Sequence, residues 1–157
     1  MKKLTVTELK KELKLKSNEE LIKEIVELYK KFPDVKDYYS SNLSAEGMLE
    51  VLEKYKKIVQ NEFFPSRGFG KLRLSVARKA VNEFKKISDS NYNIADIMLH
   101  YVENGIDFTN EYGDIEESFY SSIESMFESA LKHINKSSLG SEFYNRCEKV
   151  VDDTSGI

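Results

Sequence analysis

The sequence predicts an all-α protein of six to eight helices, packed as antiparallel hairpins in a compact bundle or a short solenoid-like stack. Two observations predict this class. Apolar residues recur at three- and four-residue spacing along most of the 157 residues, and no segment alternates apolar and polar residues as a half-buried strand does. Only 7 Gly and 2 Pro interrupt the chain, which favours long helices. No repeat or low-complexity linker divides it, so we expect a single helical domain over residues 1–157.

The first helices are expected before residue 40. Thr7, followed by leucines two and six residues later, predicts a short capped helix. Ser17 is a good N-cap for a second helix, which Pro33 interrupts because the residue before proline resists helical geometry. A short third helix is expected through Tyr38 and Tyr39. The apolar faces of all the helices are expected to turn inward. In the second helix this face consists of Leu21, Ile22, Ile25, Val26, Leu28, Tyr29 and Phe32.

Two further helices are expected in the middle of the chain. Ser44 can cap the first of them, which ends before Pro65. Residues 66–70 then form the one glycine-rich loop. Ser75 can cap the following helix, whose apolar positions end at Ile87.

Two long helices are predicted next, at about 93–112 and 115–135. Gly113 suits the left-handed residue that closes the first helix. Asp114 and Glu117 form an Asp-x-x-Glu capping pattern for the second helix. So short a connection makes the two helices antiparallel neighbours.

A last short helix is expected at 139–151, and residues 152–157 are expected to fray. The single cysteine, Cys147, lies on this helix between Arg146 and Lys149, and cations of this kind can lower the pKa of a thiol. No histidine is near in the sequence, so we interpret this cysteine as a small buried hydrophobe and not as a nucleophile.

The composition excludes several classes of protein. One cysteine and 2 His cannot build an internal disulfide or a thiolate-rich zinc or iron–sulfur site, and no cofactor is expected. No stretch approaches the ~20 apolar residues needed to cross a bilayer, and no apolar signal core follows the first residues. We therefore expect a cytoplasmic protein with no membrane partner.

Charge is strongly segregated along the chain, although the net charge is only −3. Residues 66–86 carry seven Lys or Arg and one Glu, a net charge of +6. Residues 89–131 carry ten Asp or Glu and no Lys or Arg, a net charge of −10. This arrangement predicts a surface with two electrostatic poles.

The basic segment 67–79 is the first candidate binding site. Its candidate residues are Arg67, Lys71, Arg73, Arg78 and Lys79. A glycine-containing loop that leads into a helix N-terminus can bind an anion, and Arg is suited to phosphate. The spacing is not that of a Walker loop, and Phe69 is the one aromatic residue within it. Three interpretations stay open: pairing with the acidic hairpin of the same molecule or with water, a protein or nucleic-acid surface, and a small phosphate ligand.

The second candidate is a row of four residues on one predicted helix. Asp96, His100, Glu103 and Asp107 fall in one arc of a helical wheel, where they could converge on a metal ion. The opposite arc is apolar, so these acids are expected to face water, whereas metal sites in bundles face inward. The four residues are weak metal candidates, and we predict no metal site. Gly105 lies in the apolar arc, where a missing side chain lets another helix approach.

Six segments resemble a family of short, uncharacterised bacterial helical proteins, a domain of unknown function. They are Leu-Thr-Val-Thr-Glu-Leu-Lys-Lys-Glu-Leu at 4–13, Glu-Leu-Tyr-Lys-Lys-Phe-Pro at 27–33, Lys-Tyr-Lys-Lys-Ile at 54–58, Glu-Phe-Phe-Pro-Ser-Arg-Gly at 62–68, Lys-Leu-Arg-Leu-Ser at 71–75 and Ile-Asp-Phe-Thr-Asn-Glu-Tyr-Gly-Asp-Ile at 106–115. The resemblance spans nearly the whole chain. It implies a helical fold and a bacterial origin, and it implies no activity and no site residues.

The first 30 residues are also similar to a SAP-type DNA-binding hairpin. The similarity rests on Glu8, Leu9 and Leu13, followed by residues 21–25. It implies DNA binding by this segment. The glycine usually found between the two helices of that module is absent here.

The function expected from the sequence is that of a non-enzymatic helical module that binds another protein or itself through its segregated charges. The alternative is nucleic-acid or phosphate binding through residues 67–79. A third hypothesis is an enzyme that uses carboxylate and histidine ligands to a metal. Partner identity, oligomeric state and bundle-or-stack packing stay open at this stage.

Overall fold

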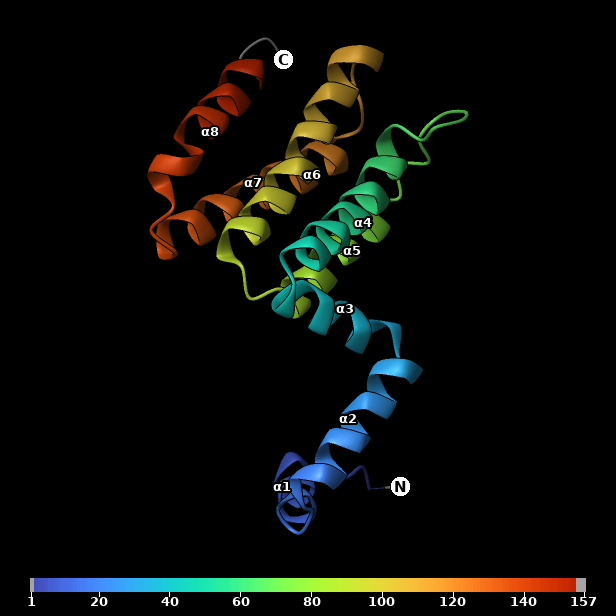
Figure 1. Ribbon diagram of the computed structural model, residues 1–157. Helices are drawn as coiled ribbons and strands as arrows, with labels where there is room; N and C mark the ends of the chain where they lie inside the picture. The colour runs from blue at the N-terminus through green and yellow to red at the C-terminus, as the bar shows by residue number, and fades with distance from the viewer. Residues whose placement is uncertain (1, 155–157) are drawn as a thin grey trace.

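The computed structural model describes residues 2–154, and within them every regular element is an α-helix (Figure 1). This confirms the predicted all-α class. The eight helices are α1 (Val6–Lys14), α2 (Asn18–Lys31), α3 (Pro33–Leu43), α4 (Ala45–Phe63), α5 (Leu74–Ile87), α6 (Asn91–Tyr112), α7 (Glu117–Lys136) and α8 (Gly140–Thr154). Within this range no helix is both long and apolar enough to cross a membrane.

Helix α6 is the centre of the fold. It packs against α4, α5, α7 and α8, and successive helices from α4 to α8 run in alternating directions (Figure 1). Its side chains are buried on almost every side, and Ile97, Leu99 and Tyr101 are completely enclosed. A helix that is apolar around most of its circumference has to be surrounded by other elements. Helices α4–α8 therefore form a bundle around α6.

The first two helices lie outside this bundle. Helix α2 packs against α3, and α1 makes no extensive contact with any of the helices from α3 to α8. In Figure 1 both extend away from the rest of the molecule. We call α1 and α2 (residues 6–31) the arm, and α4–α8 (residues 45–154) the body. The expectation that every apolar stripe turns inward is wrong for the arm, because no residue of either helix is buried.

Several helix ends follow the local chemistry predicted from the sequence. The Ser17 hydroxyl accepts a hydrogen bond from the Glu20 N–H at the start of α2, and Ser44 caps α4 in the same way. Pro33 occupies the first turn of α3, where its missing N–H costs nothing. Gly113 closes α6 with φ of 83°, a conformation that favours glycine.

Other predicted caps are wrong. Helix α1 is capped by Thr5 and not by Thr7, because Thr5 and Glu8 form a complete capping box. Helix α5 begins at Leu74, so Ser75 lies inside it. In the Asp-x-x-Glu pattern, the carboxylate of Asp114 accepts a hydrogen bond from the Tyr120 hydroxyl at 2.5 Å and caps nothing.

The C-terminal helix is longer than predicted. Helix α8 continues to Thr154, so residues 152–154 are helical and the prediction that they fray is wrong. Residues 155–157 of the predicted frayed end lie outside the described residues. The two long helices at 91–112 and 117–136 lie within two residues of their predicted bounds.

Candidate functional site

Helix α2 presents an apolar face that the rest of the chain leaves largely uncovered. At about 100° per residue, its apolar side chains occupy an arc of roughly 160°, wider than a single neighbouring helix covers. Ile22 is 62% exposed and Val26 is 43% exposed. Ile25, Leu28 and Phe32 are also exposed, to an extent similar to Val26. Large exposed apolar surfaces of this kind mark places where another molecule binds.

The arm holds its helical form by local interactions. The capping box of Thr5 and Glu8 starts α1, and hydrogen bonds from Thr5 to the carboxylate lower the pKa of Glu8. An ion pair between Lys16 and Glu24 fastens the turn between the helices to α2. The arm is therefore ordered without a core of its own.

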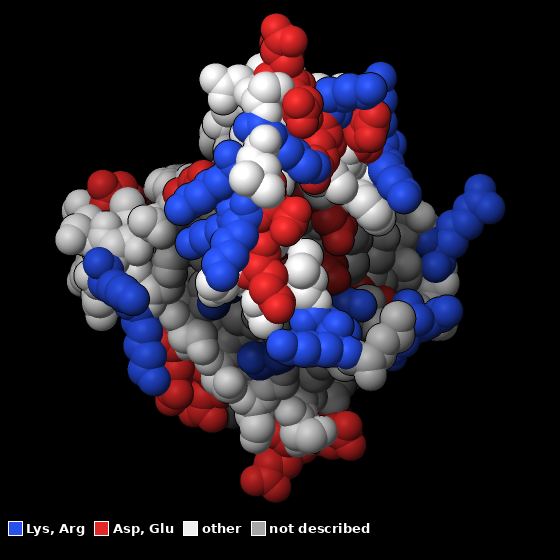
Figure 2. Space-filling view, turned by 90° about the horizontal axis from the view of Figure 1, so that it is seen from below, with Lys and Arg blue, Asp and Glu red and all other residues white. Residues whose placement is uncertain are grey.

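Charges of both signs surround the apolar face of the arm. Helix α2 carries four Glu and three Lys, and α1 carries two Glu and three Lys. Figure 2 views the molecule from the end at which the arm lies, and blue and red side chains are interspersed there. A surface that binds nucleic acid is expected to be predominantly basic. The mixture of charges fits a protein partner better.

Aromatic contacts join the arm to α3, the helix between the arm and the body. Tyr29 of α2 lies edge-on to Tyr39 of α3 at 6.4 Å between ring centroids. Tyr39 in turn packs against Tyr38 at 5.3 Å. These edge-to-face contacts fix the direction in which α2 leaves α3.

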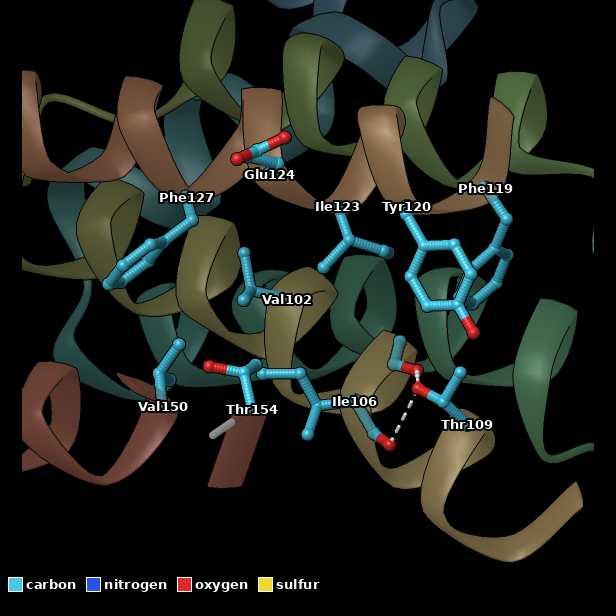
Figure 3. Close-up of a pocket in the computed structure, with 11 residues that line it drawn as sticks. Val102, Ile106, Thr109, Phe119, Tyr120, Ile123, Glu124, Phe127, Val150 and Thr154 are labelled. Atoms are coloured by element: carbon cyan, nitrogen blue, oxygen red, sulfur yellow. Dashed lines mark hydrogen bonds between the residues drawn. The ribbon is translucent and has the colours of Figure 1, made fainter. Parts of the chain in front are cut away.

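A pocket of about 360 Å³ opens in the body between α6, α7 and α8. In Figure 3, Phe127 and Ile123 point from α7 toward α6 and α8, and Val150 faces them from α8. Val102 and Ile106 of α6 form its floor. The walls are therefore mainly apolar, and the pocket can hold an apolar group by contact.

The hydroxyl groups around this pocket are already bonded within the chain. The Thr109 hydroxyl donates to the carbonyl of Gly105 at 2.9 Å, and the Tyr120 hydroxyl donates to Asp114. The Thr154 hydroxyl donates to a carbonyl one turn earlier in α8. Thr109 and Thr154 thus donate to backbone carbonyls, which cannot act as the adjacent base that a nucleophilic hydroxyl needs. The hydroxyl groups of Thr109 and Thr154 are therefore held by the backbone of their own helices.

The basic segment does not present its five candidate residues as one cationic surface. Arg73 is held by the buried carboxylate of Glu62 through its backbone N–H and two guanidinium nitrogens, at 2.7–3.1 Å. Arg78 donates to the carbonyl and hydroxyl of Ser122 in α7. Lys79 lies 3.7 Å from Glu83 on its own helix. These three side chains have structural contacts within the chain.

The other two candidates lie on the exposed loop between α4 and α5. Arg67 and Lys71 are both exposed and flank Phe69, whose side chain is 83% exposed. The Phe69 ring packs edge-on against the Tyr112 ring, with 6.3 Å between the ring centroids. Within residues 2–154, no ion pair joins the segment 67–79 to an acid of residues 89–131. The loop therefore leaves two cations and an aromatic ring together in solvent.

The acidic candidates are placed differently from the prediction. Asp96 is buried, with 9% of its surface exposed, so the expectation that it faces water is wrong. Its carboxylate lies 2.7 Å from Lys56 Nζ of α4 and 2.5 Å from Arg146 Nη1 of α8. Glu103 is half-buried and pairs with the same Arg146 at 2.5 Å. The physical reason is that cations from two other helices neutralise these carboxylates, which allows them to leave water.

These contacts shift the pKa values of Asp96 and His100. Burial alone would raise the pKa of Asp96, but hydrogen bonds and charges from Lys56 and Arg146 outweigh it and lower the pKa. Burial, helped by the positive charge of Lys56, lowers the pKa of His100. Asp107 is exposed as predicted, and its pKa is raised by partial burial and by nearby Glu103.

Cationic side chains take the place that a metal ion would need. Arg146 bridges the carboxylates of Asp96 and Glu103, and Lys56 pairs with Asp96 as well. Among the described residues, no group of three or more His, Cys, Asp or Glu side chains is arranged to hold a metal ion. Cys147 is half-buried, and burial raises the pKa of its thiol despite the nearby Arg146. Its thiolate form is therefore disfavoured, opposite to what an activated nucleophile needs.

Sequence reasoning does not identify the residues that stay exposed on α2, nor those that pair with the buried Asp96. The helical spacing places Ile22 and Val26 on a buried stripe, and only the width of the apolar arc of α2 signals that part of it stays open. Lys56 and Arg146 lie 40 and 50 residues from Asp96 in the chain, so no local pattern identifies them as its partners.

A comparison with protein families identifies the chain. The family of unknown function DUF6155 matches residues 4–156. The chain belongs to this family, which confirms the resemblance seen in the six sequence segments. The chain matches no curated protein and no solved structure.

Proposed function

We propose that this member of the DUF6155 family is a non-enzymatic helical protein-interaction module that binds its partner through the exposed apolar face of the arm. One observation carries this proposal. None of the residues of α1 and α2 is buried, although α2 has an apolar arc as wide as that of a core helix. Leaving this arc in water is unfavourable unless a partner covers it.

The energetics favour a contact of useful strength. Removing an exposed Leu or Ile side chain from water contributes roughly 1–2 kcal/mol. The exposed apolar side chains of the arm are Val6, Leu9, Leu15, Ile22, Ile25, Val26 and Leu28, and Leu4 and Phe32 flank it. Because the arm is already helical, little conformational entropy is lost when it binds. The charged residues around the face then supply specificity.

Three observations support a non-enzymatic function. The carboxylates of Asp96 and Glu103 are occupied by cations, the thiol of Cys147 has a raised pKa, and the pocket hydroxyls are bonded internally. Several charges of the basic and acidic segments form contacts within the body. We therefore assign them a supporting role, and not the main contact with the partner. We propose the cytoplasm as the location, because the single cysteine leaves the chain without a disulfide of its own.

Site-specific photocrosslinking in the cells that express the protein tests this proposal. A photoreactive amino acid replaces Ile22, on the apolar face, or Lys23, the exposed neighbour on the charged face. We expect a defined crosslinked protein band from position 22 and a much weaker one from position 23. Equal yields at both positions, or no band from either, would show that the apolar face binds no protein. Circular dichroism of each variant verifies that the helices are intact.

A second candidate function has a specific observation in its favour. The exposed Phe69 between Arg67 and Lys71 offers an aromatic face for a base beside two cations for phosphates. Fluorescence anisotropy with single-stranded oligonucleotides at low and high salt tests this function. We expect Phe69→Ala and the double variant Arg67→Ala/Lys71→Ala to weaken any binding, with Lys79→Ala as the matched control. Unchanged anisotropy in the parent protein would remove this candidate.

A further inference from the structure

We infer that the partner of the arm is a second copy of this chain, paired with it through α2 in antiparallel orientation about a two-fold axis at Ile25. This inference rests on the proposed function, because it names the molecule that covers the same apolar face. The assembly is a symmetric dimer, in which both copies use an identical surface. The charge pattern of α2 is the reason for choosing a second copy as the molecule that covers this face.

The two ends of α2 carry opposite charge. Glu19 and Glu20 lie in its first turn, and Lys30 and Lys31 lie in its last turn. When two copies of the helix run antiparallel, the acidic turn of each lies beside the basic turn of the other. A parallel pair would place like charges side by side. Helix–helix contacts between complementary charges favour the antiparallel orientation.

These four charged side chains are available for such pairing. All four are exposed, and within residues 2–154 none of them forms an ion pair. By contrast, Glu24 near the middle of the helix is already held by Lys16 of the same chain. Glu19 and Lys30 therefore offer charge at one edge of the apolar face, whereas Lys31 Nζ already lies 5.5 Å from the centroid of the Phe32 ring in its own chain.

The apolar residues fit the same register. With Ile25 on the two-fold axis, a residue i faces residue 50 − i of the second copy. Ile22 then meets Leu28 of the second copy, Leu21 meets Tyr29, and Ile25 meets its own counterpart. At about 100° per residue, Glu19 and Lys30 project from the same edge of the apolar face, so Glu19 of each copy lies beside Lys30 of the other, whereas Glu20 and Lys31 project away from this face. One register thus brings together the apolar positions and one pair of opposite charges at each end.

The shape of the molecule leaves room for this pairing. The arm extends away from the body, so the α2 helices of two copies can lie side by side while the two bodies stay apart (Figure 1). Helix α2 has 14 residues and is about 21 Å long, enough for the three apolar layers described above. The contact is confined to the arm and needs no rearrangement of α4–α8.

Cysteine crosslinking tests the orientation. Ile25→Cys and Asn18→Cys are each introduced into a Cys147→Ser chain, on the same face of α2 and two turns apart. In the antiparallel pair the two copies of position 25 meet, whereas the two copies of position 18 are about 21 Å apart. We expect rapid disulfide-linked dimers from Ile25→Cys and not from Asn18→Cys. Equal crosslinking at both positions would indicate a parallel pair and overturn the inference.

A charge-swap series measured by sedimentation equilibrium of the full chain tests the contacts. The double variant Glu19→Lys/Glu20→Lys places like charges at both ends of the pair, and we expect it to weaken dimerisation by about tenfold or more. Adding Lys30→Glu/Lys31→Glu to the same chain restores the complementarity and should restore the dimer. Rescue by the quadruple variant excludes simple unfolding as the cause of the loss.

The outcomes separate this inference from the proposed function. A chain that stays monomeric at every concentration, yet crosslinks a different protein from position 22 in cells, overturns the dimer and leaves the interaction module standing. A monomer that crosslinks nothing in cells removes both. A dimer that the charge swap does not affect also overturns the antiparallel arrangement, because its ends would then make no contact.

Discussion

Helices α2 and α4 have similar N-termini but lie in opposite environments. Each is capped by a serine, and each has an apolar stripe at helical spacing. In α4, Val51, Tyr55 and Val59 are buried against α5 and α6, whereas α2 has no buried residue. The difference teaches that local sequence decides whether a helix forms, and that the neighbouring helices decide whether its apolar face is covered.

The two regions also treat charge differently. In the body, Asp96 and Glu103 are drawn out of water by Arg146, which holds α8 against α6. In the arm, the charged side chains at the ends of α2 stay exposed. Exposed ion pairs contribute little to stability and much to specificity of association. The body uses its charges to fix a fold, and the arm leaves them available for a partner.

The largest expected effect contrasts one phenylalanine of each region. Phe63 is 1% exposed in the body and Phe32 is 45% exposed at the end of the arm. We expect Phe63→Ala to lower the free energy of unfolding by about 3–5 kcal/mol, because it leaves a cavity. Phe32→Ala should cost about 1 kcal/mol, because the side chain is half in water already. Urea unfolding followed by circular dichroism measures both, and equal losses would contradict the division into arm and body.

A smaller effect is expected at the closest helix contact in the body. A Cβ atom added to Gly105 would lie 2.2 Å from Cδ1 of Ile123 in α7, which confirms that this glycine permits close approach. We expect Gly105→Ala to destabilise the protein by about 1–3 kcal/mol through overpacking. Ile123→Val removes the nearest clashing atom, so the double variant should lose less than the sum of the two single losses. Additive losses would show that the two helices adjust without strain.

The pH dependence should also come from the body. The pKa of Asp96 is lowered by its cations, so its contribution is present above its unfolded pKa and is lost as the pH falls through the folded pKa. The lowered pKa of His100 acts in the same direction, because the unfolded chain takes up its proton first as the pH falls below about 6.5. We therefore expect the urea concentration at the midpoint of unfolding to fall below about pH 6.5 because of His100, and to fall further below about pH 4 because of Asp96.

Two variants isolate these contributions. His100→Gln should flatten the upper part of this pH profile, and Asp96→Asn should flatten the lower part at the cost of lower stability at neutral pH. A profile that neither variant changes would place the pH dependence in other groups. The control variant is Glu8→Gln, which removes a carboxyl group with a lowered pKa from the arm and leaves the body unchanged.

The smallest expected effect is the removal of a cap from the arm. Ser17→Ala deletes the hydroxyl that accepts from the Glu20 N–H, which typically costs about 1 kcal/mol of helix stability. Because the arm has no core, we expect this loss to appear as faster amide hydrogen exchange in α2, with α6 unchanged. Ser44→Ala, the matched change in α4, should instead lower the stability of the whole body.

Much of the fold could be predicted from the sequence, because helix formation depends on neighbours in the chain. The spacing of apolar residues predicted the all-α class, and Ser17, Ser44, Pro33 and Gly113 marked helix ends correctly. The errors at Thr7 and Ser75 come from choosing between nearby capping positions. Such choices depend on the geometry of a single turn.

The sequence by itself determined that this chain forms amphipathic helices, since hydrogen bonds and caps within each helix are local. Only the tertiary structure decided which of their faces are covered. Asp96 is buried because Lys56 and Arg146 arrive from other helices, and Ile22 stays in water because no helix arrives beside it. Both results depend on residues far away in the sequence, and a helical wheel contains no information about them.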